Sequence, residues 1–243
     1  MNKHHGEKYC STHNIALDKL GTHFYCKMCV KNQTAVGSKY SSTNDVVLQK
    51  KTQFDFSKLG IPRRYMQSTF DNYISKYVVQ KNIYEAIRDY TSNFNKGLQK
   101  NLIFIGGAGV GKTHLACSML KVLAGKGLRV KFTTSYDLLN RFIENWKNPN
   151  FFESSEIDNF ATYDLLVIDE YGLYDQKDFQ KDYIHRVLLK RYELKKPTVI
   201  ISNQKNTEIQ ESLGFRVWSR LNQDGLEIYE FIWGDIRINK ETY

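Results

Sequence analysis

From about residue 54 onward, short and mainly apolar runs alternate with stretches in which apolar residues recur every three or four positions. The first pattern predicts strands and the second predicts helices. The predicted strands are residues 102–105, 130–133, 165–168, 198–201 and 226–233, and the predicted helices are 112–124, 136–146 and 179–192. Apolar strands separated by helices are typical of a parallel sheet buried on both faces. We therefore expect an α/β doubly wound domain with helices on both sides of the sheet.

Three regions of the chain differ in composition. Residues 1–30 hold three of the four cysteines, residues 31–53 are polar and rich in Ser, Thr and Lys, and residues 54–243 have the globular pattern. The middle region predicts a linker, with some helical character near residues 46–48. We therefore expect a small N-terminal module joined by a linker to one α/β domain.

The bulk composition sets broad limits on function. Hydrophobic residues make up 41% of the chain, which is enough for one sizeable core. No apolar run reaches the ~18 residues that a membrane span needs, and the N-terminus lacks the apolar segment of a secretory signal, so we expect a cytoplasmic protein with no membrane partner. Lys and Arg number 35 against 26 Asp and Glu, and the net charge of +9 suits a nucleic acid without requiring one.

The segment after the first predicted strand has the spacing of a phosphate-binding loop (P-loop). Its residues are Gly106, Gly107, Ala108, Gly109, Val110, Gly111, Lys112 and Thr113. Glycines let backbone N–H groups wrap closely around phosphate oxygens, and a helix that begins near Lys112 directs the positive end of its dipole at them. Lys112 would contact the β- and γ-phosphates, and Thr113 would offer its hydroxyl to Mg²⁺. The strand before the loop and the helix after it are the context that this motif requires, so the sequence predicts binding of ATP with Mg²⁺.

Polar residues follow two other predicted strands. Asp169 and Glu170 come directly after residues 165–168, and Asn203 follows residues 198–201 after one serine. Because ligands of parallel sheets bind at the carboxyl ends of the strands, we predict that Asp169 holds Mg²⁺ and that Glu170 polarises the attacking water. Asn203 would hydrogen-bond that water or the γ-phosphate, although an asparagine is also a common first residue of a loop. Together with Lys112, these residues predict a site that hydrolyses ATP.

Two pairs of metal-binding residues lie close together near the N-terminus. Cys10 and His13 form one pair, and Cys26 and Cys29 form the other. Thiolate and imidazole ligands on paired turns suit a tetrahedral zinc ion. His23 is an alternative fourth ligand, and free thiols or a disulfide are the other interpretations. We predict a small zinc-ribbon-like module that folds around its metal.

Taken together, the motifs of the globular part resemble those of AAA+ ATPases of the DnaC/IstB type. The resemblance extends from about residue 54 to the end of the chain, and its motifs are residues 106–113 with His114 after them, residues 165–170, and Ser202-Asn203. Residues 60–65 and 70–73 resemble the family's segment that leads into the fold and lies near the adenine. The resemblance implies an AAA+ P-loop NTPase fold, and because little chain follows Arg220 we expect no separate helical lid domain.

The resemblance also implies roles for individual residues. Ser219-Arg220 matches the arginine-finger motif of the family, so Arg220 would reach the γ-phosphate of a neighbouring subunit in a head-to-tail assembly. Arg216, one helical turn earlier, is a second candidate for this role. Arg237 matches a late arginine that senses nucleotide, and His114 belongs to the nucleotide-binding segment. Without the resemblance, an alternative interpretation of Arg216 and Arg220 is that they are ordinary solvated or DNA-facing arginines.

DnaC-type proteins load the replicative DNA helicase, so the resemblance favours an ATP-dependent helicase loader. Such a protein would bind single-stranded DNA through basic and aromatic side chains and hold the hexameric replicative helicase, with the N-terminal module as the contact. An IstB-like transposition ATPase that acts with a transposase is the first alternative, because the two motors are alike. A nucleotide-switched DNA-binding adaptor with negligible turnover is the second, and the carboxylates of Asp169 and Glu170 argue against it.

Overall fold

The computed structural model describes residues 18–20, 23–25, 56–94, 99–146, 153–173 and 178–236. Contacts between residues divide the chain into two units, Met1–Gln53 and Phe54–Tyr243. In the first unit, β1 (Asp18–Leu20) and β2 (His23–Tyr25) form an antiparallel pair in which Asp18 lies opposite Tyr25. The predicted linker, with its helical character near residues 46–48, lies outside the described residues.

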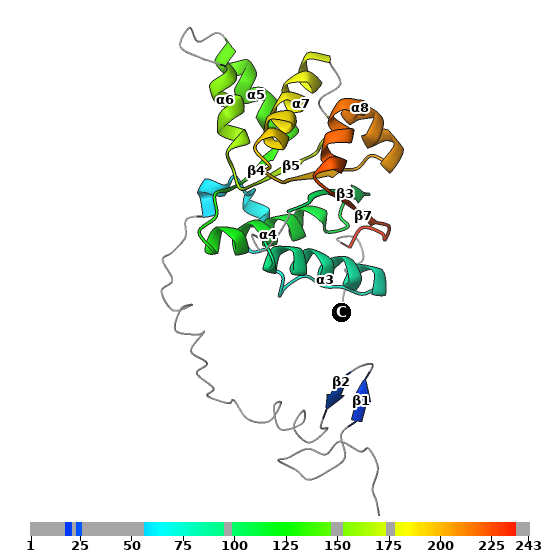
Figure 1. Cartoon of the computed structure of the whole chain (residues 1–243). Helices are drawn as coiled ribbons and strands as arrows, with labels where there is room; N and C mark the ends of the chain where they lie inside the picture. Colours follow the sequence, from blue (N-terminus) through cyan, green and yellow to red (C-terminus); the bar gives the residue numbers. More distant parts are fainter. Residues whose placement is uncertain are drawn as a thin grey trace, which may run out of the picture. The chain divides into compact units, whose positions relative to one another are not determined.

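A five-stranded parallel sheet forms the centre of the second unit (Figure 1). Its strands are β3 (Asn101–Gly106), β4 (Val130–Thr134), β5 (Leu165–Asp169), β6 (Thr198–Ser202) and β7 (Leu226–Phe231). Their order across the sheet is β4-β5-β6-β3-β7, and every neighbouring pair is parallel. The predicted parallel sheet is therefore confirmed. The last strand ends at Phe231, earlier than predicted, because Phe231 pairs with Gly106, the last residue of β3.

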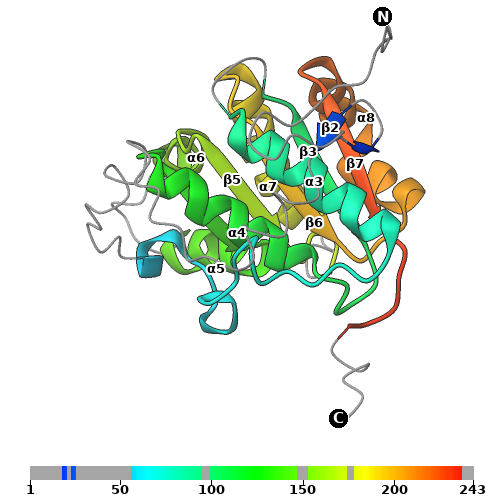
Figure 2. The same ribbon diagram turned by 90° about the horizontal axis from the view of Figure 1, so that it is seen from below.

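Helices cover both faces of this sheet (Figures 1 and 2). One face is covered by α3 (Val78–Ser92) and α4 (Lys112–Gly125), and two short 3-10 turns, η1 (Phe56–Leu59) and η2 (Arg63–Tyr65), precede them in the chain. The other face is covered by α5 (Ser135–Trp146), α6 (Glu153–Ala161), α7 (Asp178–Glu193) and α8 (Asn206–Gln223). The predicted helices correspond to α4, α5 and α7, whereas α3, α6 and α8 are not among the predicted elements. No helix of the described residues is both long and apolar enough to cross a membrane.

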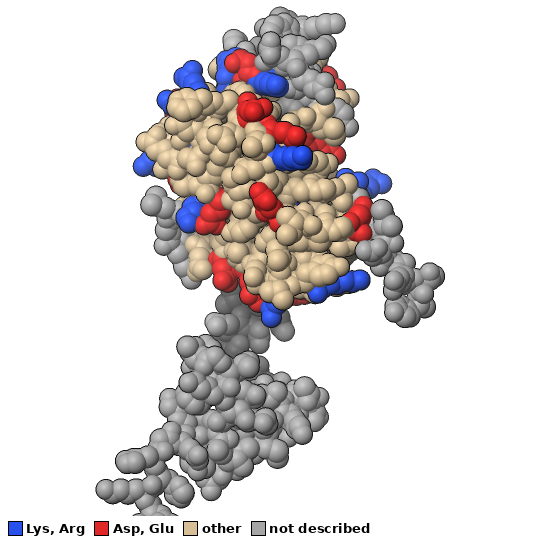
Figure 3. Space-filling view, turned by 90° about the vertical axis from the view of Figure 1, so that its right-hand side faces the viewer, with Lys and Arg blue, Asp and Glu red and all other residues tan. Residues whose placement is uncertain are grey.

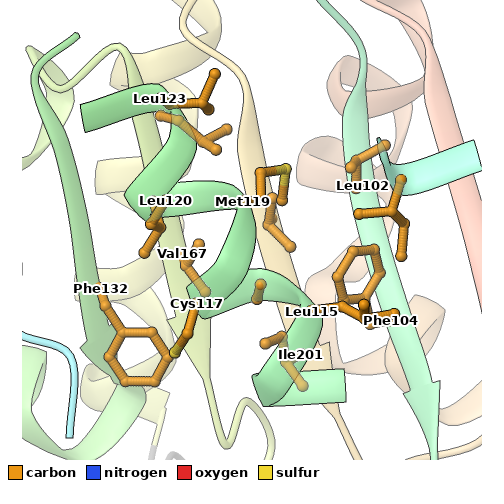
Figure 4. Packing of buried hydrophobic residues seen from close by; sticks show 14 of the residues in the cluster. Leu102, Phe104, Leu115, Cys117, Met119, Leu120, Leu123, Phe132, Val167 and Ile201 are labelled. Atoms are coloured by element: carbon orange, nitrogen blue, oxygen red, sulfur yellow. The ribbon is translucent and has the colours of Figure 1, made fainter. Parts of the chain in front are cut away.

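Alternate residues of the strands pack into separate layers of the core. Phe104 of β3 and Val167 of β5 lie in the layer between the sheet and α4 (Figure 4). Their neighbours Ile103 and Ile168 lie in the layer that includes residues of α5, α7 and α8. Every residue of β5 is buried. Burial on both faces explains why the central strands are apolar at successive positions rather than at every second one.

Candidate functional site

A pocket of about 340 Å³ opens at the carboxyl ends of β3, β5 and β6. It is lined by Arg64, Tyr65, Ala108, Gly109, Val110, Gly111, Lys112, Thr113, His114, Asp169, Glu170, Asn203 and Ile236. The strand order β5-β6-β3 places the ends of these strands side by side. The pocket therefore brings together the glycine-rich loop after β3, the carboxylates at the end of β5 and the amide after β6.

The backbone of the loop adopts conformations that glycine takes without strain. φ is 72° at Gly109 and 97° at Gly111. A Cβ atom at Gly111 would lie 2.8 Å from the ring of Tyr73, and one at Gly109 would overlap the carboxylate of Asp235. Because α4 begins at the next residue, Lys112, the N–H groups of its first turn and the positive end of its dipole lie at the pocket.

Lys112 links the loop after β3 to the residue after β6. Its side chain is buried, with 6% of the residue exposed. The ammonium donates hydrogen bonds to the carbonyl oxygens of Gly106 at 2.5 Å and Gly107 at 2.6 Å, and to Oδ1 of Asn203 at 2.9 Å. A lysine ammonium is a compact charge with three rotatable donors. It is therefore able to exchange these oxygens for those of a phosphate.

Asp169 is held beside Thr113 by two hydrogen bonds. Its Oδ2 accepts a bond from the hydroxyl of Thr113, and its Oδ1 accepts one from the backbone N–H of Glu170, both at 2.8 Å. Burial raises the pKa of Asp169, while these hydrogen bonds and the positive charges of Lys112 and Arg64 act in the opposite direction. A hydroxyl and a carboxylate at this distance are the kind of oxygen donors that Mg²⁺ takes beside a phosphate. The residues present therefore fit a magnesium ion with a nucleotide.

Glu170 follows the strand in a strained conformation. Its φ of 58° is left-handed, which costs a residue other than glycine about 1–3 kcal/mol and is typical of functional sites. Its carbonyl oxygen accepts a hydrogen bond from Oγ of Ser135 at 2.8 Å, and the next N–H, that of Tyr171, donates to the carbonyl of Ile201 at 3.0 Å. Burial and the charge of Asp169 raise the pKa of the Glu170 carboxyl. A carboxylate of this kind that lines a pocket is suited to accept a proton from water.

His114 connects the pocket to the segment before α3. Its Nε2 lies 2.9 Å from the carbonyl oxygen of Thr69, and its ring meets that of Tyr73 edge to face, with centroids 5.4 Å apart. Burial lowers the pKa of His114, which favours the neutral ring. Arg64 and Tyr65, from the segment that the resemblance places near the adenine, also line the pocket.

The residues after β7 contribute contacts that the sequence does not predict. Nε1 of Trp233 donates a hydrogen bond to the carbonyl oxygen of Val110 at 2.9 Å. The backbone N–H of Ile236 donates to the carbonyl oxygen of Gly109 at 3.2 Å. Both acceptors are backbone atoms of the loop more than a hundred positions away, so no sequence motif marks them.

Other predicted site residues do not line the pocket. Arg216 and Arg220 lie in the second half of α8, after an interruption at Gly214. Arg220 is half-buried, and its guanidinium lies 5.5 Å from the ring centroid of Tyr192. Arg237 and the four predicted zinc ligands (Cys10, His13, Cys26 and Cys29) lie outside the described residues, among which no group of three or more His, Cys, Asp or Glu side chains is placed to hold a metal ion.

Comparisons with known proteins agree with this geometry. A family model described as IstB-like ATP binding protein matches residues 50–220. The replicative helicase loader DnaC of Buchnera aphidicola subsp. Baizongia pistaciae is 30% identical over 200 residues, which cover 80% of this chain and 81% of that protein. An ATP-binding protein of insertion sequence IS5376 from Geobacillus stearothermophilus is 26% identical over 226 residues, covering 93% and 81% of the two chains. A crystal structure of the DnaC helicase loader matches with a TM-score of 0.62 and 29% identity over 70% of this chain and 99% of the other.

Proposed function

The chain belongs to the family of IstB-like ATP-binding proteins and has the AAA+ P-loop NTPase fold, and from this premise we propose that it is an ATP-hydrolysing loader of the replicative DNA helicase. The proposal rests mainly on the similarity to DnaC helicase loaders, which extends over about four fifths of both chains. The pocket supports the proposal, because its lining combines a lysine, a hydroxyl, two carboxylates and an amide, which are the groups that a nucleoside triphosphate with Mg²⁺ requires.

In this proposal, each residue of the pocket has a distinct role. Lys112 exchanges its present oxygen partners for those of the β- and γ-phosphates, and Thr113 and Asp169 hold Mg²⁺, which neutralises phosphate charge. Glu170 accepts a proton from the attacking water. Asn203, already hydrogen-bonded to Lys112, orients that water or the γ-phosphate.

We also propose that the site is completed by a second copy of the chain in a head-to-tail assembly. Neither Arg220 nor Arg216 lines the pocket of its own chain, which is compatible with a role for one of them in the neighbouring site. An arginine supplied in this way neutralises charge that develops during phosphoryl transfer. Arg237 is proposed as a nucleotide sensor on the strength of the resemblance alone.

Single-stranded DNA is the proposed nucleic-acid partner, and Figure 3 shows the charged side chains on one face of the molecule. On that face, Lys and Arg side chains are scattered among Asp and Glu and separated by uncharged residues. Single-stranded DNA is bound by grooves with continuous positive charge and exposed aromatic rings. The described residues on that face do not form such a continuous positive surface.

The N-terminal unit is proposed to bind zinc through Cys10, His13, Cys26 and Cys29 and to contact the helicase. The hairpin of β1 and β2 supports this proposal. Asp18 and Tyr25 are paired at its open end, so the first and last residues of the hairpin lie side by side. The Cys10/His13 pair precedes the hairpin and the Cys26/Cys29 pair follows it, and this arrangement is compatible with four ligands around one ion.

Hydrolysis is tested by measuring ATP turnover of the wild type and of Glu170→Gln, each with and without single-stranded DNA. We expect Glu170→Gln to turn over ATP about 100- to 10,000-fold more slowly, because it removes the general base, and to bind ATP as well as the wild type does. Near-zero turnover in all four measurements would instead support the nucleotide-switched adaptor.

The loader role is tested by a pull-down of the replicative helicase with the full chain and with a chain that lacks residues 1–53. We expect the full chain to bind the helicase and the shortened chain to lose it. If the full chain does not bind the helicase but binds a transposase on duplex DNA, the transposition ATPase is the better assignment. The transposition ATPase is the alternative to test because the similarity to the insertion-sequence protein covers 93% of this chain.

A further inference from the structure

The last residue of β7 and the residues that follow it, 231–236, contact the P-loop at several points, and we call this segment the strap. A Cβ atom at Gly106 would lie 2.4 Å from the carbonyl oxygen of Phe231, so the strap begins in close contact with the first glycine of the loop. The indole N–H of Trp233 and the backbone N–H of Ile236 then donate to two successive loop carbonyls, those of Val110 and Gly109.

These two hydrogen bonds set the direction of two peptide groups of the loop. A peptide group is planar and trans, so its C=O and N–H point in opposite directions. When Ile236 holds the carbonyl of Gly109 on the strap side, the N–H of Val110 must point away from the strap. When Trp233 holds the carbonyl of Val110, the same applies to the N–H of Gly111. Backbone N–H groups of this loop are the groups that wrap a phosphate.

The indole of Trp233 is itself held in place. The centroid of its ring lies 5.1 Å from that of Phe231, and the centroid of the Phe231 ring lies 5.6 Å from that of Phe104, a buried residue of β3. Phe231 is 1% exposed. A row of packed rings therefore connects β3 to the hydrogen bond on Val110, so the donor is fixed before any ligand binds.

We propose that the strap is a positioning element of the nucleotide site, and that Trp233 is its main positioning residue. It fixes the amides of Val110 and Gly111 in the direction that receives phosphate oxygens, so that binding does not have to order them. The proposal rests on the proposed ATP site and adds to it a residue that does not line the pocket. A purely structural role would instead anchor the end of the chain without changing nucleotide affinity.

The test uses the full chain with Trp233→Phe, which keeps an aromatic ring and removes the N–H donor. Trp218→Phe is the matched control, because Trp218 lies on α8 and does not line the pocket. The dissociation constant for a fluorescent ADP analogue is measured by titration, and amide hydrogen exchange of the P-loop is measured without nucleotide. We expect Trp233→Phe to bind ADP about two- to tenfold more weakly, as the loss of one hydrogen bond implies, and to exchange loop amides faster. Trp218→Phe should match the wild type in both measurements.

A second pair of variants makes the test independent of the stability of Trp233→Phe. Ile236→Pro removes the backbone donor to Gly109, whereas Ile236→Ala keeps that donor and removes only the side chain. The proposal requires weaker ADP binding and faster loop exchange in the proline variant than in the alanine variant. Affinities and exchange rates equal to their controls in both pairs would overturn it. If the wild type itself binds no ADP, the proposed ATP site is wrong, while the exchange measurement still decides whether the strap orders the loop.

Discussion

Two buried cations lie at opposite ends of the sheet, Lys112 beside the carboxyl ends of the strands and Arg191 of α7 beside the amino ends. Arg191 has no exposed surface. Its guanidinium donates to Oγ1 of Thr198 and to four backbone carbonyls, those of Phe160, Ala161, Tyr163 and Pro197, at distances between 2.5 and 3.1 Å. Both cations thus have oxygen partners from the backbone, but the two sites differ in what those partners can do.

The partners of Arg191 are fixed, whereas those of Lys112 can be exchanged. The guanidinium is a rigid planar fork, and it joins the end of α6 to the residues that begin β5 and β6. Burial lowers the pKa of Arg191 to about 9, while the charge of Asp164 acts in the opposite direction. The ammonium of Lys112 instead lies in a pocket and bonds to a glycine-rich loop. The contacts at the amino ends of the strands therefore hold elements of the fold together, whereas the carboxyl ends carry the proposed nucleotide site.

The largest expected effect is on stability at the amino end. Arg191→Ala leaves three buried carbonyls and one partly buried carbonyl without their donor, and we expect the free energy of unfolding to fall by about 3–5 kcal/mol. Chemical denaturation monitored by circular dichroism measures this change. The control is Arg186→Ala, an exposed arginine of the same helix, which should change stability by less than about 0.5 kcal/mol. Equal losses in the two variants would contradict the structural role of Arg191.

Lys112→Ala should show the opposite pattern. We expect nucleotide binding to weaken about 10- to 100-fold, because charge-assisted hydrogen bonds to phosphate are lost. The free energy of unfolding should change by less than about 1 kcal/mol, since the variant also removes the cost of burying a charge. Nucleotide titration and chemical denaturation of the same sample test both statements.

Lys126→Ala is the matched control for Lys112→Ala. Lys126 lies just after α4 and donates hydrogen bonds to the carbonyls of Thr91 and Ser92, not to those of the loop. Its replacement should leave nucleotide affinity unchanged. If both variants lose affinity equally, the contacts of Lys112 with the loop do not explain nucleotide binding.

The same contrast explains which features the sequence predicts. The motifs of residues 108–113, the strand-end carboxylates and Asn203 depend on local spacing after apolar strands, and in the structure these residues line one pocket. The contacts of Trp233 and Arg191 depend on distant backbone carbonyls, which every residue has and which leave no sequence pattern. Two of the helices that the sequence does not predict have irregular patterns. The first residues of α3, Val78 and Val79, are apolar but exposed, so they do not follow the helical spacing of its buried residues. The helix α8 is interrupted at Gly214, where φ is 67° and ψ is 159°.

The smallest expected effect concerns Asp164, which directly precedes β5 and lies at the opposite end of that strand from Asp169. Burial acts to raise the pKa of Asp164, but the hydrogen bonds from Lys196 and from the N–H of Arg129, together with the charges of Lys196 and Arg191, lower it below its ordinary value of 3.8. The folded state therefore holds the proton less tightly than the unfolded state. The resulting stability is fully present above the unfolded pKa and is lost as the pH falls through the folded pKa.

Asp164→Asn should therefore be less stable than the wild type at pH 7 by about 0.2–1 kcal/mol, the range for a partly exposed ion pair, and the difference should shrink as the pH falls below about 4. Urea denaturation at a series of pH values measures the difference. Lys196→Met removes the other partner, whose Nζ lies 2.7 Å from Oδ1 of Asp164, and should reproduce the same pH dependence with a similar size. A difference that stays constant from pH 7 to pH 3 would show that Asp164 acts through packing or neutral hydrogen bonds.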